Sequence, residues 1–235
     1  MRSAPLVLGV LASGRGSNLQ AILDAIASGR CPARVAVVVS DRKDAPALER
    51  ARQAGIRAVH LDPRAYPDRT AFDDAVAGVL DGHGVELVCL AGYMRVLSAA
   101  FVRRYLARIL NVHPALLPAF PGLHAQRQAL GHGVKVSGAT VHFVDEGVDT
   151  GPIVLQAAVP VLDDDTEATL AARILAEEHR LYPEAIRLYA EDRLELTGRH
   201  VSVRPPPQAE GRPPQAEGRR PQAEGRPKNP NARPD

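Results

Sequence analysis

The chain has 235 residues, and 45% of them are hydrophobic, an ordinary fraction for a globular protein. Of its 29 basic and 27 acidic residues, eight basic and four acidic ones lie from Arg199 onward, which leaves 21 basic and 23 acidic residues in 1–198. That body lacks the basic excess of a nucleic-acid-binding protein, and its two cysteines do not suggest a disulfide framework or a metal cluster. We therefore expect small-molecule partners, with no nucleic acid and no metal.

The first predicted element is the strand "PLVLGVLA" at 5–12. Its apolar run is too short, and reaches Gly14 and Gly16 too soon, for a signal peptide or a membrane span. We expect a cytoplasmic protein that does not associate with membranes.

Helices and strands then alternate. The patterns predict helices at 17–29, 45–54 and 68–80 and strands at 34–40, 57–61 and 85–92. Four strands separated by three helices indicate βαβ units with right-handed crossovers. From the strand at 107–113 onward, helices and strands no longer alternate regularly. Segments 135–144 and 151–161 alternate like antiparallel strands, and a long helix over 165–190 has Thr166 as its N-cap. The predicted fold is α/β, a doubly wound and mostly parallel sheet with antiparallel strands in its C-terminal half.

The C-terminal segment has a different composition. "PQAEGR" occurs at 207–212, 214–219 and 221–226, and nine of the 20 prolines lie from Pro205 onward. Such a segment cannot bury enough apolar surface to offset its ordering entropy. We expect one domain over 1–198 and a disordered tail over 199–235.

The turn "LASGRGSNLQ" after the first strand is suited to an anion. Gly14 and Gly16 permit a sharp turn, and Ser17 and Asn18 add donors at the N-terminus of a helix. Leu19 stands where a dinucleotide fingerprint has its third small residue. By itself the motif leaves a dinucleotide, a monophosphate and a purely structural turn open.

A polar pair marks the end of the strand at 107–113. Asn111 and His113 project from the same face at its carboxyl end, and Pro114 keeps His113 extended. The amide can donate to a developing oxyanion, and the imidazole can move a proton near neutral pH. In isolation, such a pair equally fits a strand end that satisfies loop carbonyls.

Asp149, in the loop "DEGVDT" between two strands, favours the catalytic interpretation. A carboxylate beside a histidine raises the pKa of the ring and holds it in place. His142 and Thr140 share one face of a strand and are candidates to support the cluster. With no serine or cysteine nucleophile beside these residues, the pattern indicates direct transfer to an incoming amine.

Four motifs in this order and spacing resemble one family. "SGRGSNLQAI", "AGYMRVLS", "LNVHPALLPAFPGLHA" and "GATVHFVDEGVDTGPI" are similar to the phosphoribosylglycinamide formyltransferases of purine biosynthesis over about residues 5–195. The resemblance implies a Rossmann-like formyltransferase fold, 10-formyltetrahydrofolate as co-substrate, 5-phosphoribosylglycinamide as acceptor, and a homodimer.

The resemblance also implies site residues. Asn111, His113 and Asp149 match the catalytic residues, and Gly16, Ser17, Asn18 and Glu178 match the phosphoribosylglycinamide site, with neighbouring Glu177 as an alternative to Glu178. Arg69, Met94, Arg95, Val96, Leu97 and Asn111 match the folate site. Without the resemblance, Met94, Val96 and Leu97 would be assigned to ordinary core packing.

Other functions remain open at this level. Methionyl-tRNA formyltransferases and formyltetrahydrofolate hydrolases share a related H-P-[SA]-L-L-P core, but the former carry an extra C-terminal domain and the latter an extra N-terminal one. A non-catalytic nucleotide-binding module on the same sheet would leave Asn111 and His113 dispensable.

Overall fold

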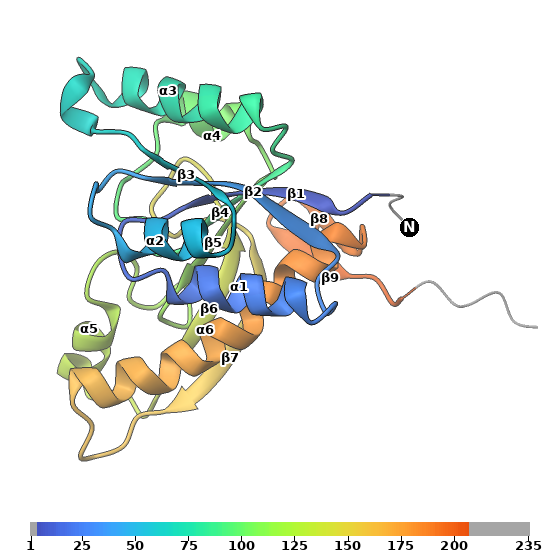
Figure 1. The fold of residues 1–235 in the computed structure, drawn as a ribbon. Helices are drawn as coiled ribbons and strands as arrows, with labels where there is room; N and C mark the ends of the chain where they lie inside the picture. Colours follow the sequence, from blue (N-terminus) through green and yellow to red (C-terminus); the bar gives the residue numbers. More distant parts are fainter. Residues whose placement is uncertain (1–3, 207–235) are drawn as a thin grey trace, which may run out of the picture. The chain divides into compact units, whose positions relative to one another are not determined.

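The computed structural model describes residues 4–206, which form a seven-stranded sheet flanked by helices and a separate two-stranded hairpin (Figure 1). The sheet contains β1 (Leu6–Leu11), β2 (Ala33–Ser40), β3 (Arg57–His60), β4 (Leu87–Leu90), β5 (Ile109–His113), β6 (Val136–Phe143) and β7 (Ile153–Pro160). The helices are α1 (Ser17–Ala27), α2 (Pro46–Gln53), α3 (Arg69–Gly82), α4 (Ala99–Arg104), α5 (Ala125–His132) and α6 (Glu167–Ala190), with a 3₁₀ turn, η1, at Pro63–Ala65. The hairpin consists of β8 (Leu194–Thr197) and β9 (His200–Val203).

The strand order is β3-β2-β1-β4-β5-β6-β7. The pairs from β3 to β5 are parallel, whereas β6 pairs antiparallel with both β5 and β7. Along the chain, β2 and β3 are added on one side of β1, and β4 then pairs with β1 on its other side. Ligands bind at such a switch point, outside the carboxyl ends of the strands. The predicted α/β class and the change to antiparallel pairing are both confirmed.

The sheet is covered on both faces because alternate strand residues point in opposite directions. Leu8 and Val10 pack in one core with α1, α2 and α6, whereas Leu11 packs in a second core with α3 and α4. In Figure 1, α3 and α4 accordingly lie on the opposite side of the sheet from α1 and α6. Gly9 has no room for a Cβ, since one would lie 3.0 Å from both methyl groups of Val85.

Helix α6 is tied to the strands that carry the site. The hydroxyl of Tyr182 is fully buried and lies 2.8 Å from the carbonyl oxygen of Leu110 and 3.1 Å from that of Leu90. A buried hydroxyl needs such a partner, and the contact sets the position of α6 relative to the ends of β4 and β5. As predicted, α6 begins after Thr166, whose side chain accepts from the backbone N–H of Thr169.

The sequence analysis did not predict η1, α4, α5 or the β8–β9 hairpin. Helix α4 has only six residues, and α5 follows a left-handed residue, His124, so neither has a long periodic signal. The domain boundary expected at residue 198 falls within the turn of the hairpin, since β9 continues to Val203. The PQAEGR repeats at 207–226 and the rest of the expected tail lie outside the described residues. No helix within 4–206 has the length and apolar character needed to span a bilayer.

Candidate active site

The site is assembled where β5 ends beside β6. Asn111 and His113 are two residues apart on β5 and therefore share a face. The antiparallel register places His142 opposite Asn111 and Thr140 opposite His113. All four polar side chains predicted on these two strands are thus neighbours.

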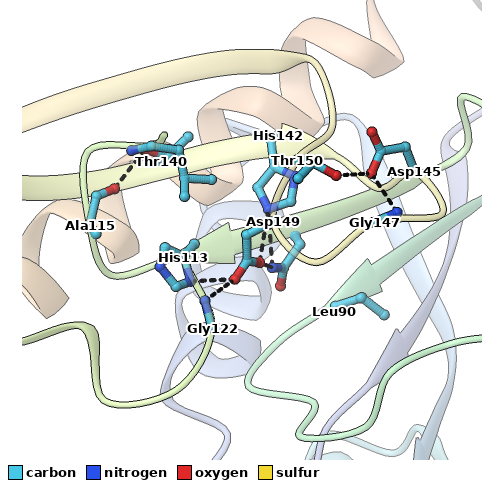
Figure 2. Close-up of polar contacts among 12 residues, drawn as sticks. Leu90, His113, Ala115, Gly122, Thr140, His142, Asp145, Gly147, Asp149 and Thr150 are labelled. Atoms are coloured by element: carbon cyan, nitrogen blue, oxygen red, sulfur yellow. Dashed lines mark hydrogen bonds and ion pairs between the residues drawn. The ribbon is translucent and has the colours of Figure 1, made fainter. Parts of the chain in front are cut away.

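Asp149 joins this group from the β6–β7 loop. Figure 2 shows its carboxylate between the two histidines. One oxygen, Oδ2, lies 3.2 Å from Nδ1 of His113 and accepts from the backbone N–H of Gly122 at 2.8 Å. The other, Oδ1, accepts from the amide of Asn111 at 3.3 Å and lies 3.5 Å from Nε2 of His142. The expected meeting of residues 111, 113 and 149 is therefore present in the structure.

His113 is buried and has an acceptor at each ring nitrogen. Nδ1 faces Asp149, and Nε2 lies 2.8 Å from the carbonyl oxygen of Phe120. Only the charged ring can donate to both, whereas a neutral ring donates to one. Burial nevertheless lowers the pKa of His113 below its ordinary value, outweighing Asp149 and Phe120, which raise it. Asp149 thus acts to raise this pKa, as expected, but the ring loses more by desolvation than it gains from the pairing.

The amide of Asn111 is shared between two partners. Its Nδ2 donates to Asp149 and lies 3.2 Å from Nε2 of His142. Nδ1 of His142 lies 2.8 Å from the carbonyl oxygen of Phe143, so Nε2 is the ring nitrogen that faces both the Asn111 amide and Oδ1 of Asp149. The amide of Asn111 is thus already engaged inside the cluster, so donation to a substrate oxygen requires one of its contacts to be exchanged.

The carboxylate of Asp149 remains ionised in this environment. Burial acts to raise the pKa of Asp149, but His142, the N–H of Gly122 and His113 together lower it below its ordinary value. Its backbone has a φ of 54°, in the left-handed region that a residue with a side chain seldom adopts. The left-handed backbone of Asp149 thus places its charged carboxylate beside the ring of His113.

Thr140 supports the proline-rich loop after β5. Its hydroxyl donates to the carbonyl of Ala115 at 2.7 Å and accepts from the N–H of Leu117 and the amide of Gln156, each at 3.0 Å. That loop supplies Phe120 and Gly122 to the cluster. The side chain thus acts on the loop facing His113, whereas the sequence had suggested only a role beside His142.

The glycine turn forms a second part of the site, at the end of β1. Gly16 has a φ of 72°, and a Cβ there would lie 2.8 Å from Ala47. No side chain caps α1, and its first turn contains no acidic residue. The N-terminus of the helix is therefore available to an anion.

Arg50, on α2, was missed by the sequence analysis. Its Nε donates to the carbonyl of Arg15 at 2.9 Å and its Nη1 to the side chain of Gln20 at 3.1 Å. Both partners are neutral, so neither bond offsets the positive charge of this half-buried side chain beside the turn. Together with Ser17, Arg30 and His179 it lines a cavity of about 350 Å³. Because residues 15 and 50 are distant in sequence, no local pattern could have indicated this contact.

Asn18 and Glu178 meet beneath the turn. Both are 7% exposed, and Nδ2 of Asn18 donates to Oε2 of Glu178 at 2.7 Å. Burial raises the pKa of Glu178, and the bond from Asn18 only partly opposes this. Glu177 instead pairs with Arg180 near the surface. Of the two neighbouring glutamates, Glu178 is the one that faces the turn.

The segment after β4 borders the same edge. Met94 and Val96 are 60% and 53% exposed, whereas Leu97 is buried in the core. The packing interpretation is thus correct for Leu97 and wrong for the other two. Arg95 lies over the ring of Phe72 at 4.9 Å, and the segment is joined to the glycine turn by a bond from the N–H of Met94 to Ser13. Arg69, the first residue of α3, is exposed.

Comparisons with known proteins agree on one family. Residues 7–186 match the formyl transferase family model. The chain is 47% identical over 187 residues to the phosphoribosylglycinamide formyltransferase of Escherichia coli (strain K12), covering 80% of this chain and 88% of the relative.

Solved structures extend the likeness. A glycinamide ribonucleotide transformylase from Symbiobacterium toebii superimposes with a TM-score of 0.85 at 63% identity, covering 87% of this chain and 96% of the other. A formyltetrahydrofolate deformylase from Pseudomonas syringae gives a TM-score of 0.80 at 26% identity, covering 86% of this chain and 67% of the other.

Proposed function

Since this chain belongs to the formyl transferase family, we propose that it transfers the formyl group of 10-formyltetrahydrofolate to the amine of 5-phosphoribosylglycinamide. The products are N-formyl-phosphoribosylglycinamide and tetrahydrofolate, in the purine (IMP) biosynthetic pathway. The proposal is supported above all by the anion turn at Gly16 and the Asn111–His113–Asp149 cluster, which lie on one edge of the sheet.

The spacing of these two parts suits the acceptor. The turn follows β1 and the cluster ends β5, with only β4 between them. Two strand intervals correspond to about 10 Å. A ribose that carries a phosphate at one end and a glycinamide amine at the other has a comparable length. With the phosphate at Gly16, Ser17 and Asn18, near Arg50, the sugar passes Glu178 and the amine reaches His113.

The chemistry follows from the groups at the strand end. The amine nitrogen attacks the formyl carbon, the carbonyl electrons move to oxygen, and an N–H of Asn111 stabilises the resulting oxyanion. His113 takes the proton that the amine loses and delivers it to N10 of the folate as the C–N10 bond breaks. The ring exchanges the carbonyl of Phe120 for the substrate at Nε2. Asp149 holds Nδ1 and stabilises the transient imidazolium.

We place the folate co-substrate beside the segment that follows β4. Met94 and Val96 offer exposed apolar surface to a flat ring, and the backbone from 94 to 97 offers polar groups to its edge. Arg95 and Arg69 provide positive charge for the carboxylates of the folate. His142 and Thr140 support Asn111 and the loop without contacting either substrate.

Two acceptors other than phosphoribosylglycinamide are possible in related enzymes, namely water and charged tRNA. If water were the acceptor, the anion-binding turn and the adjacent Arg50, whose hydrogen-bond partners are neutral, would have no ligand to bind. Their presence therefore favours the phosphorylated acceptor. We further propose a cytoplasmic location, a homodimeric state, a catalytic domain ending after β9 and a tail that takes no part in the reaction.

An acceptor assay tests the function. Purified protein is incubated with 10-formyltetrahydrofolate and with phosphoribosylglycinamide, charged tRNA or buffer alone, and tetrahydrofolate release is measured. We expect turnover with phosphoribosylglycinamide alone. His113→Ala should lower kcat by about a hundredfold or more while circular dichroism stays unchanged. Equal turnover in buffer alone would replace the proposal with a hydrolase, and an active His113→Ala protein would remove the proton-transfer role.

A further inference from the structure

The loop that carries Asp149 depends on a restricted backbone. A Cβ at Gly151 would collide with the carbonyl oxygen of Phe143, and Asp149 itself has a positive φ of 54°. Within the loop, Thr150 donates its hydroxyl to Asp145 at 2.6 Å, a contact visible in Figure 2. A left-handed aspartate is disfavoured unless surrounding contacts hold it.

One of those contacts comes from the C-terminal hairpin. Nη2 of Arg199, in the turn between β8 and β9, donates to the carbonyl oxygen of Thr150 at 2.6 Å. Thr150 directly follows Asp149. The two residues in contact are 49 positions apart in sequence, and Arg199 lies beyond residue 186, where the match to the family model ends.

The hairpin is itself anchored. Leu194 and Val201 pack against the hydrophobic core, and Nε of Arg193 donates to the carbonyl of Arg204 at 2.7 Å, closing the open end of the hairpin. The guanidinium of Arg199 is therefore held on a fixed element. The charge on the donor makes this bond stronger than one between neutral groups.

We infer that Arg199 is a positioning residue for the proposed transfer reaction. By holding the carbonyl of Thr150, it fixes the peptide that follows Asp149 and so keeps the carboxylate directed at Nδ1 of His113. This inference rests on the proposed function. It adds Arg199, which the sequence analysis had placed in the tail over 199–235, to the residues that catalysis needs.

The effect on His113 follows from the groups around the ring. Asp149 faces it from the loop, His142 from β6, and the carbonyl of Phe120 from the segment after β5. Of these, Asp149 and Phe120 favour the charged ring, whereas His142 opposes it. If the carboxylate withdraws, the ring loses its anionic partner and releases its proton at lower pH.

Three variants test the inference. Arg199→Gln removes the charge, Arg199→Lys retains it, and Arg204→Gln is a matched control, because the side chain of Arg204 pairs with Glu195 in the same hairpin and does not touch the loop. Steady-state kinetics give kcat and both KM values, each across the pH range, and thermal melting checks the fold. The titration of His113 is followed separately by histidine NMR.

We expect Arg199→Gln to lower kcat roughly fivefold, a change that corresponds to the free energy of one exposed charge-assisted hydrogen bond. The KM for phosphoribosylglycinamide should be unchanged, because the glycine turn is elsewhere. The acid limb of the profile and the NMR titration of His113 should move to lower pH. Arg199→Lys should restore part of the activity, and Arg204→Gln should match the wild type.

Two results would overturn the inference. One is wild-type kcat and an unchanged His113 titration in folded Arg199→Gln protein, and the other is an equal loss in Arg204→Gln. If the wild type does not formylate phosphoribosylglycinamide, the proposed function fails. The NMR titrations of the same variants then still decide whether Arg199 positions Asp149.

Discussion

Replacing Asp149 with asparagine tests the central contact of the site, because it removes one charge and keeps the shape. The carboxylate receives four contacts on two oxygens: His113 and Gly122 at Oδ2, and Asn111 and His142 at Oδ1. An asparagine offers a single acceptor oxygen. With that oxygen at the Oδ2 position, its NH₂ replaces Oδ1 and meets the NH₂ of Asn111, which donates to that position in the wild type.

The magnitude can be bounded from the geometry. Unit charges 3.2 Å apart interact by about 5 kcal/mol at an effective dielectric constant of 20, an upper limit that desolvation of the ring reduces. A hydrogen bond to a charged group contributes about 1.5 to 3 kcal/mol. We therefore expect Asp149→Asn to lower kcat by about tenfold to a hundredfold.

The pH dependence gives a second, independent readout. Asp149 raises the pKa of His113 against the larger effect of burial, so its removal should lower that pKa further. The neutral ring, which can accept the amine proton, then persists to lower pH. The acid limb of the kcat profile should therefore move to lower pH in the variant.

The assay is initial-rate formyl transfer at saturating concentrations of both substrates between pH 5.5 and 9. Glu146→Gln provides a control, since it removes a negative charge from the same loop, and its exposed pair with Arg103 contributes little. A folded Asp149→Asn enzyme with kcat within about twofold of the wild type and a superimposable profile would refute a role for the carboxylate on the ring.

Two further predictions concern the glycine turn. Arg50→Gln should raise the KM for phosphoribosylglycinamide by about tenfold and leave the KM for the folate unchanged, because a charge-assisted contact to phosphate is lost. Arg52→Gln is the control, since Arg52 is an exposed neighbour paired with Glu49. Equal KM values for phosphoribosylglycinamide in the two variants would contradict the assignment. Glu178 has its pKa raised by burial, so the stabilisation that its protonated form provides is complete below pH 4.5 and is lost as the pH rises through its folded-state pKa. Urea unfolding without substrates should therefore show Glu178→Gln gaining stability relative to the wild type as the pH rises from 4 to 7, whereas a constant difference would exclude this titration.

Much of the fold was accessible from local patterns. Each strand from β1 to β7 and the helices α1, α2, α3 and α6 were predicted within a few residues, because periodicity and glycine stops are properties of neighbouring residues. Helices α4 and α5 were missed because six and eight residues do not establish a period. The hairpin was missed because the composition of the neighbouring tail obscured it.

The sequence by itself determined which residues could share a strand face: Asn111 with His113, and Thr140 with His142. It also identified the turn able to hold an anion. These features follow from bond geometry and from spacings of two to four residues.

Only the tertiary structure decided what each group does there. It brought Glu178, rather than Glu177, to Asn18 across 160 positions. It also placed Arg50 in contact with the glycine turn and Arg199 in contact with the loop that carries Asp149. It also decided the net direction of the pKa shift at His113, because the effect of burial exceeds that of Asp149 and depends on how far the folded chain excludes water from the ring. Burial is a property of the whole packed domain, and no short segment of the sequence specifies it.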